Sequence, residues 1–209
     1  MEQEKKSSKD RTNGNAFWTF IRKNGLNIAM GIVVVILLVS PDAKAWTLKQ
    51  LMRTGLFNAS IEEKHTGTSD IVGVDFQFED ENGEVRRLSS LRGKVVFVNF
   101  WASWCPPCRA EFPSIQALHS KFGNNPDIFF LMMNEDRERS AATNYLDQEG
   151  YEFPVYRSRG PVPEEIYTGT LPTTIVLDKK GRIRMHHTGF ANYSSRKFLE
   201  QIEALIAEL

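Results

Sequence analysis

The sequence of 209 residues contains only two cysteines, Cys105 and Cys108. A disulfide between them would close too short a loop to constrain much of the unfolded chain, so it would stabilise a fold poorly. A structural zinc site would need two more Cys or His ligands at similar spacing. The four histidines are instead scattered along the chain, at His65, His119, His186 and His187. This scarcity favours a reactive cysteine pair over a metal site or a structural bridge.

The sequence also has no excess of charge of either sign, because 26 Lys and Arg residues balance 26 Asp and Glu residues. It therefore offers no electrostatic argument for a nucleic-acid partner, and we expect none. Internal repeats, low-complexity segments and flavin or nicotinamide motifs are absent as well. We expect no cofactor and no metal. The composition, 41% hydrophobic and 25% charged, is typical of one globular domain with an appendage.

One hydrophobic run stands out, at residues 26–40, behind a basic N-terminal segment of residues 1–25. The run is uncharged and too hydrophobic all round for an amphipathic surface helix. It is short for a membrane span, which needs roughly 17 to 25 residues. The Lys and Arg excess before it places the N-terminus in the cytoplasm and the remainder outside. We therefore expect a single-pass, uncleaved transmembrane or signal-anchor helix in the inner (cytoplasmic) membrane, with the C-terminal domain facing the periplasm or outside.

A cleavable signal peptide is the alternative, because Ala43-Lys44-Ala45 has the small-x-small form of a cleavage site. The segment before the hydrophobic run is long for a signal peptide, which favours the anchor. Under either interpretation, the C-terminal domain is exported. An oxidising compartment tends to consume free thiols in structural disulfides, so a single close cysteine pair there is suited to exchange.

Residues 41–70 read as a juxtamembrane helix followed by a polar tether, and residues 71–209 as the globular domain. Alternating apolar residues predict half-buried strands, and unbroken apolar runs predict strands covered on both faces of a parallel sheet. Apolar residues at spacings of three and four predict helices. The order βαβα then ββα indicates an α/β fold with one mixed sheet flanked by helices. The expected elements are a hairpin over 74–88, a strand over 95–100, a helix over 105–122, a strand over 127–133, a helix over 140–148, an extended piece over 153–156, strands over 171–177 and 182–187, and a helix capped by Ser194 or Ser195.

The two cysteines lie at the junction of the apolar strand and the helix that follows it. This is the arrangement of a thioredoxin-like redox site. At a helix N-terminus, unpaired backbone N–H groups and the helix dipole favour a thiolate at Cys105. Pro106 and Pro107 suit the first helical turn, which does not need their missing N–H groups. Cys108 can reach back over one turn and close a small disulfide ring.

Several ordered motifs resemble the TlpA/ResA family of membrane-tethered thioredoxin-like proteins. The resemblance covers residues 71–209, roughly two thirds of the chain. It rests on Gly93-Lys94-Val95-Val96, the run from Asn99 to Pro113 that includes Trp101-Ala102-Ser103-Trp104-Cys105-Pro106-Pro107-Cys108, Phe153-Pro154, Leu171-Pro172-Thr173-Thr174 and Asp178-Lys179-Lys180-Gly181.

The resemblance implies a thioredoxin-like fold in which Cys105 is the attacking thiolate, Cys108 the resolving thiol and Pro172 a cis-proline beside the disulfide. It implies a reductase of exported protein disulfides, for instance in cytochrome c maturation. A membrane thiol carrier would donate the electrons, and we expect a monomer. The substrate peptide is expected to lie against Trp104, Pro106, Pro107, Leu171 and Thr173.

Two positions leave the source of proton transfer open. Thioredoxin has a buried Asp where this chain and its TlpA/ResA relatives have Asn99. Some ResA-like proteins place an acidic residue near the site from the loop after the second central strand. Glu135 is our candidate for that role, although alignment puts Arg137 on the position. We interpret Glu111 as a packing residue and Pro113 as the cause of a helix kink, and we give a chemical role of either residue second place.

Three other classes use related sequences. A DsbA-like oxidase or isomerase runs the same chemistry in the opposite direction, and the sequence leaves the direction open. A peroxiredoxin-like peroxidase needs a Thr where this chain has Ala102, which excludes that class. A copper-binding module of the Sco type needs three residues between its cysteines and a downstream His, so the spacing of two disfavours it.

Overall fold

The structure is a computed structural model that describes residues 23–52, 55, 57–61 and 74–208. The chain divides into two compact units, Met1–Lys44 and Ala45–Leu209. The predicted basic segment 1–25 lies almost wholly outside the described residues, as does most of the predicted tether. The first unit contributes a helix over Lys23–Val39, and helix α2 (Pro41–Met52) follows.

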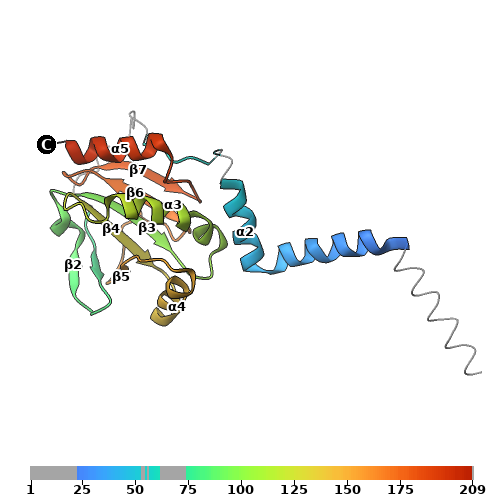
Figure 1. Cartoon of the computed structure of the whole chain (residues 1–209). Coiled ribbons are helices and arrows are strands. Elements are labelled where there is room, and N and C mark those ends of the chain that lie inside the picture. Colours follow the sequence, from blue (N-terminus) through green and yellow to red (C-terminus); the bar gives the residue numbers. More distant parts are fainter. Residues whose placement is uncertain (1–22, 53–54, 56, 62–73, 209) are drawn as a thin grey trace, which may run out of the picture. The chain divides into compact units, whose positions relative to one another are not determined.

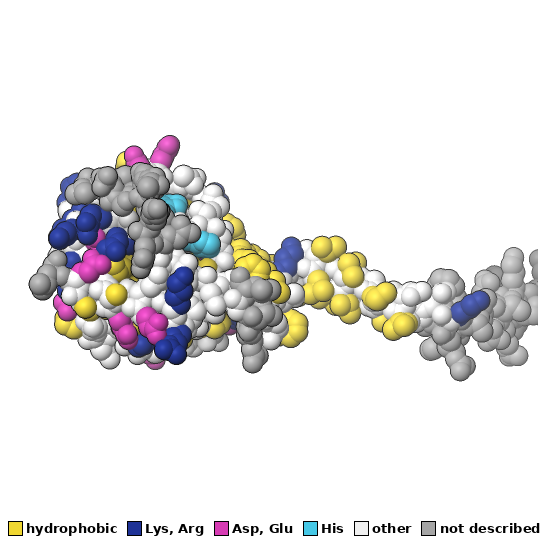
Figure 2. Space-filling model, turned by 90° about the horizontal axis from the view of Figure 1, so that it is seen from above, with side chains coloured by type: hydrophobic (Ala, Val, Ile, Leu, Met, Phe, Trp, Pro, Cys, Tyr) yellow, Lys and Arg dark blue, Asp and Glu magenta, His cyan; other side chains and the backbone are white. Residues whose placement is uncertain are grey.

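The helix over Lys23–Val39 presents apolar side chains along its surface (Figure 2). No single helix among the described residues is long and apolar enough to cross a membrane. The helix over Lys23–Val39 and α2 together are long and apolar enough, but only as a pair bent by 93° and only by length and composition. Membrane anchoring therefore stays a prediction.

The second unit is built on a seven-stranded mixed sheet in the order β2-β1-β5-β4-β3-β6-β7 (Figure 1). The central pairs β3–β4 and β4–β5 are parallel, and the other neighbours are antiparallel. The strands are β1 (Gln77–Glu79), β2 (Val85–Arg87), β3 (Val95–Trp101), β4 (Ile128–Asn134), β5 (Val155–Ser158), β6 (Thr173–Leu177) and β7 (Ile183–Thr188).

The central strand β3 is buried along its whole length, which explains its unbroken apolar sequence. Alternate side chains enter two separate cores because successive residues of a strand point to opposite faces. Phe97 lies on one face, in a core that also contains buried residues of helices α3 (Pro106–Phe122), α4 (Arg139–Glu149) and α5 (Arg196–Ala207). Phe100 packs on the opposite face, where a short 3-10 helix η1 (Leu88–Leu91) lies.

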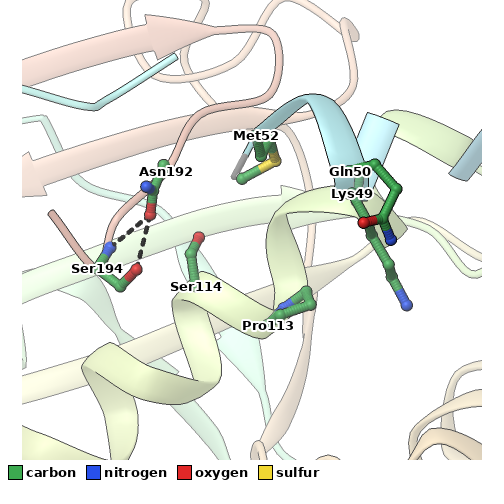
Figure 3. A pocket seen from close by; sticks show the side chains of 8 residues that line it. Lys49, Gln50, Met52, Pro113, Ser114, Asn192 and Ser194 are labelled. Atoms are coloured by element: carbon green, nitrogen blue, oxygen red, sulfur yellow. Dashed lines mark hydrogen bonds between the residues drawn. The ribbon is translucent and has the colours of Figure 1, made fainter. Parts of the chain in front are cut away.

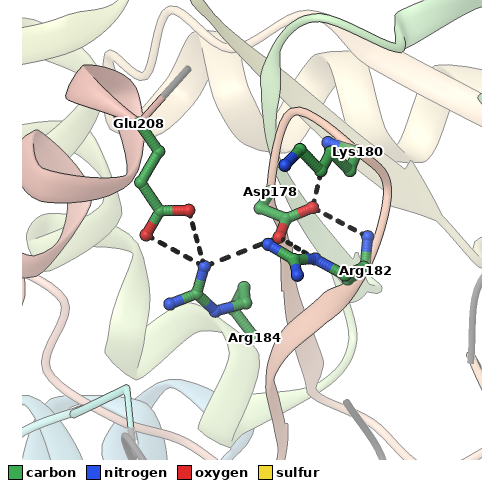
Figure 4. A network of polar contacts seen from close by, with 5 residues as sticks. All are labelled: Asp178, Lys180, Arg182, Arg184 and Glu208. Atoms are coloured by element: carbon green, nitrogen blue, oxygen red, sulfur yellow. Dashed lines mark hydrogen bonds and ion pairs between the residues drawn. The ribbon is translucent and has the colours of Figure 1, made fainter. Parts of the chain in front are cut away.

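The β6–β7 turn is held by a buried carboxylate, Asp178, which is 2% exposed (Figure 4). Its Oδ1 accepts hydrogen bonds from the backbone N–H groups of Lys180 and Arg182 at 3.0 and 2.9 Å. Arg182 Nε donates a third, and Arg184 links the turn to Glu208 after α5. Burial alone would raise the pKa of Asp178, but these hydrogen bonds outweigh it and lower the pKa.

The structure confirms the predicted mixed α/β sheet flanked by helices, with small shifts in the ends of elements. Helix α3 begins at Pro106 rather than Cys105, which is its N-cap. Strand β5 begins two residues later than the expected extended piece because its pairing with β4 starts at Val155. The N-terminal hairpin joins the main sheet through β1 and β5, which local sequence patterns could not predict.

Candidate active site

The two cysteines form a disulfide at the start of α3, with their Cα atoms 5.3 Å apart. Cys105 is the N-cap residue, and its Sγ accepts a hydrogen bond of 3.3 Å from the backbone N–H of Cys108. Pro106 and Pro107 occupy the first turn of the helix. In the reduced form, the same N–H and the dipole of this 17-residue helix would stabilise a Cys105 thiolate.

The two sulfurs differ in accessibility, because Cys105 is 4% exposed and Cys108 is completely buried. Beside them, Trp104 is 63% exposed, whereas Trp101 is buried in the core against Phe112. The two tryptophans are therefore divided between the core and the surface. An incoming disulfide can reach Cys105 before Cys108, next to an exposed indole.

The loop that leads into Cys105 is held by a second buried carboxylate, Asp136, at the end of β4. Asp136 accepts hydrogen bonds from the backbone N–H and the hydroxyl of Ser103, both at 3.0 Å. Asn134 Nδ2 donates another at 2.8 Å, and Arg157 binds the carbonyl oxygen of Asp136. Asp136 directly follows Glu135 in a charged stretch of the sequence, but its side chain is buried and fixes the active-site loop.

Glu111 lies three residues after Cys108, so both project from the same side of α3. Its side chain is completely buried and receives hydrogen bonds from Asn99 Nδ2 at 2.7 Å and from the backbone N–H of Ala191 at 3.4 Å. Desolvation raises the pKa of Glu111 to about 8, although both hydrogen bonds act to lower it. A carboxyl with this pKa can take up or release a proton near neutral pH.

The sequence pattern favours packing over chemistry at Glu111, but it also contains a signal for a functional carboxyl. Positions 108, 111, 112, 115 and 118 follow the three-and-four spacing of a buried helix face, and Glu111 is the one charged side chain among them. A carboxylate in an apolar stripe is rare unless it is paired or functional.

The Leu171–Pro172 peptide bond is cis, as the resemblance predicts. Pro172 and Thr173 are buried, and Leu171 is half-buried. The strand that follows is joined to the carboxylate site, because Asn99 Nδ2 also donates to Thr174 Oγ1 at 2.9 Å.

Glu135, the proton-transfer residue that the sequence analysis predicts, lies half-buried at the end of β4, where its backbone N–H donates to Trp101 O at 2.8 Å. Burial raises the pKa of Glu135, and the nearby Arg157 opposes this shift. Glu135 lines a polar pocket of about 250 Å³ together with Glu79, Asp136 and Arg159. Its role in proton transfer stays a prediction.

Comparison with known proteins places this geometry in a family. The family model described as Redoxin matches residues 70–202. The thiol-disulfide oxidoreductase ResA of Bacillus anthracis is 33% identical over 151 residues, covering 72% of this chain and 82% of that protein. ResA of Bacillus subtilis is 30% identical over 135 residues, covering 64% and 75%.

Solved structures agree with the sequence relatives. A Chlorobium tepidum protein described as a thiol:disulfide interchange protein DsbE superposes with a TM-score of 0.56 at 30% identity, over 65% of this chain and 96% of that one. StoA of Bacillus subtilis shares the fold, with a TM-score of 0.50 at 23% identity over 64% and 97%. The chain therefore belongs to the redoxin family, as a ResA-like thiol-disulfide oxidoreductase with a thioredoxin-like fold.

Proposed function

We propose that this protein reduces disulfides of exported proteins through the Cys105–Cys108 dithiol. The observation that carries the proposal is the pair's position at the N-terminus of α3, with the buried carboxyl of Glu111 one turn further along the helix. The ResA relatives, named as thiol-disulfide oxidoreductases, support the reaction class.

The reaction begins with attack of the Cys105 thiolate on one sulfur of a substrate disulfide, which forms a mixed disulfide and releases the first substrate thiolate. The Cys108 thiolate then attacks Cys105 Sγ, closes the internal disulfide and releases the second substrate thiolate. The substrate gains two electrons and two protons. The dithiol must then be regenerated by an external thiol donor, for which we propose a membrane thiol carrier.

Glu111 is the proposed proton acceptor for Cys108. Cys108 is completely buried, so its thiol has no direct route to solvent for its proton. A carboxyl whose pKa is about 8 matches the pKa of a thiol, about 8.5, closely enough for transfer in either direction. Glu135 is the proposed alternative, from the loop at the end of β4.

The exposed indole of Trp104 is the proposed contact for the substrate peptide, together with Pro106, Pro107, Leu171 and Thr173. Cytochrome c maturation is the proposed setting. The proposed location is the outer side of the cytoplasmic membrane, with residues 26–40 as the anchor. The apolar surface of the helix over Lys23–Val39 supports anchoring.

The reduction potential of the Cys105–Cys108 pair tests the direction of electron flow. A potential near or below about −250 mV supports a reductase, whereas one near about −120 to −180 mV indicates a DsbA-like oxidase or isomerase. A pair that forms no disulfide in a redox buffer contradicts both. Protease added to intact spheroplasts tests the location, because an exported domain is digested and a cytoplasmic one is protected.

A further inference from the structure

The short segment Phe57–Ile61 is attached to the domain beside the buried carboxylate. Asn58 pairs with Asn192 in an isolated parallel bridge. Within it, the backbone N–H of Ala59 donates to Asn192 O at 2.9 Å, and Asn192 N–H donates to Phe57 O at 2.7 Å. Asn192 Nδ2 adds a hydrogen bond of 2.9 Å to Asn58 Oδ1.

Both ends of this segment have further contacts. The rings of Phe57 and Phe190 are 4.9 Å apart between centroids. At the other end, the side-chain amide of Gln201 on α5 binds both backbone groups of Ile61, accepting from its N–H at 2.8 Å and donating to its carbonyl oxygen at 2.6 Å. Ala59 and Ile61 are buried in the same core as α3. The segment is thus an integral part of the folded domain.

The residues on either side of Asn192 face the opposite way, toward α3. Ala191 N–H donates to Glu111 Oε2, and Tyr193 N–H donates to Ser114 Oγ at 3.1 Å. The Ser114 hydroxyl in turn donates to Glu111 O at 2.7 Å. In an extended chain, the backbone N–H and C=O groups of successive residues point to opposite sides. Asn192 therefore binds the segment while its two neighbours bind the helix that carries Glu111.

We propose that Phe57–Ile61 is a positioning element for Glu111: by pairing with Asn192 it holds the loop Gly189–Tyr193 against α3, which keeps the Ala191 N–H directed at the carboxyl and keeps water out. The inference deepens the proposed function, because Glu111 is the group that takes the proton of Cys108.

Release of the loop would bring water toward Glu111, because an open pocket borders the loop at Asn192 and borders α3 at Ala110 and Ser114. This pocket, of about 420 Å³, lies between α2 and α3, with Asn192 and Ser194 on one side and Pro113 and Ser114 on another (Figure 3). Ser194 is bound to Asn192 Oδ1 through both its backbone N–H and its hydroxyl. The pairing around Asn192 thus orders one wall of the pocket.

Among the described residues, the groups around Glu111 that could affect its pKa are mostly neutral. Strands β3 and β6 contribute the neutral side chains of Asn99 and Thr174. The loop contributes the buried phenol of Tyr193, and α3 itself contributes the cysteine pair. Because desolvation is the largest cause of the raised pKa of Glu111, access of water should lower that pKa.

The test follows the carboxyl carbon of Glu111 by 13C NMR across pH in the full chain, with Glu111→Gln identifying the signal. The test variant is Asn58→Ala with Gln201→Ala. The matched control removes the same two residue types from exposed positions of α4, Asn144→Ala with Gln148→Ala. Asn58→Asp is the conservative variant, because it keeps the oxygen that accepts from Asn192 Nδ2.

We expect the titration midpoint of the test variant to fall by about one unit or more, with the control and Asn58→Asp unchanged. Exchange of the Ala191 amide should also be about tenfold faster or more. An unchanged midpoint together with unchanged Ala191 protection overturns the inference. If the double variant does not fold, the two single variants give the same comparison.

The experiment separates this inference from the proposed function. Wild-type protein that fails to exchange with a disulfide substrate contradicts the proposed function, whatever the NMR titration shows. Wild-type protein that exchanges normally, with a Glu111 midpoint insensitive to the segment, contradicts the positioning role alone.

Discussion

Asn99 Nδ2 lies 2.7 Å from Glu111 Oε1, and both side chains are completely buried. Thioredoxin has a carboxylate at the position of Asn99, on the strand. This protein instead carries its buried carboxyl on the helix, with the strand supplying the hydrogen-bond donor. The helix position puts the carboxyl one turn from Cys108, and five predictions follow from this site and its scaffold.

Replacement of either cysteine should separate attack from resolution. Cys105→Ala should reduce disulfide exchange to the uncatalysed background because the accessible nucleophile is lost. Cys108→Ala should still attack but accumulate a mixed disulfide with the substrate, since no second thiolate resolves it. Mass spectrometry after acid quenching detects the trapped species. Trapping through Cys108 in the Cys105→Ala protein would contradict these roles.

Glu111→Gln should slow exchange at pH 7 to 8 by about 10²-fold or more, the usual contribution of a positioned acid–base group. The amide still accepts a hydrogen bond from Asn99, so packing is kept. The wild-type rate should show a pH transition near 8 that the variant lacks. Stopped-flow measurement of mixed-disulfide resolution checks this, with Glu135→Gln as the parallel variant. A transition that survives Glu111→Gln and disappears in Glu135→Gln would move the role to Glu135.

The same carboxyl should make stability fall as pH rises. The folded pKa of about 8 lies above the ordinary value of 4.5, so the folded protein keeps a proton that the unfolded chain has released. Stability is therefore lost between pH 4.5 and 8, by as much as about 5 kcal/mol at 1.36 kcal/mol per unit. Urea unfolding at pH 5 and pH 8 should show a smaller decrease for Glu111→Gln than for wild type. Equal decreases would mean that Glu111 is not buried as a neutral acid.

Asn99→Leu should raise the pKa of Glu111 further, because the hydrogen bond from Asn99 favours the charged carboxylate. It should also cost about 1–3 kcal/mol of stability, since Glu111 and Thr174 lose a buried partner. The pH transition of exchange and the urea midpoint measure the two effects. A transition that moves to lower pH would contradict the assigned hydrogen bond.

The Asp178 turn should affect stability without affecting exchange chemistry. Asp178→Ala should cost about 2–3 kcal/mol because two backbone N–H groups and Arg182 lose a buried acceptor. Glu208→Ala should cost under about 1 kcal/mol, because its pairing with Arg184 is partly exposed. Thermal unfolding measures both. The reduction potential of the cysteine pair should be unchanged in each variant.

Sequence patterns predicted the parts of this protein that depend on neighbours along the chain. The cysteine pair at a strand–helix junction follows from an apolar run, two prolines and a helical stripe that are contiguous in sequence. The order of helices and strands follows from periodicity, and Ser195, one of two candidate caps, accepts a hydrogen bond from Phe198 N–H at the start of α5. These signals are local, so tertiary packing was not needed to find them.

Tertiary structure alone decided the surroundings of Glu111, Asp136 and Phe57–Ile61. Glu111 and Asn99 are 12 residues apart, and Ala191 lies 80 residues from Glu111. The raised pKa of Glu111 comes from burial by several elements at once. The periodicity of the sequence shows only that a charged residue lies in an apolar helix face. The sequence by itself determined the fold class and the place of the cysteine pair at a strand–helix junction. Packing between distant segments decided that Glu111 is a buried carboxyl with a raised pKa, because desolvation and these hydrogen bonds exist only once those segments meet.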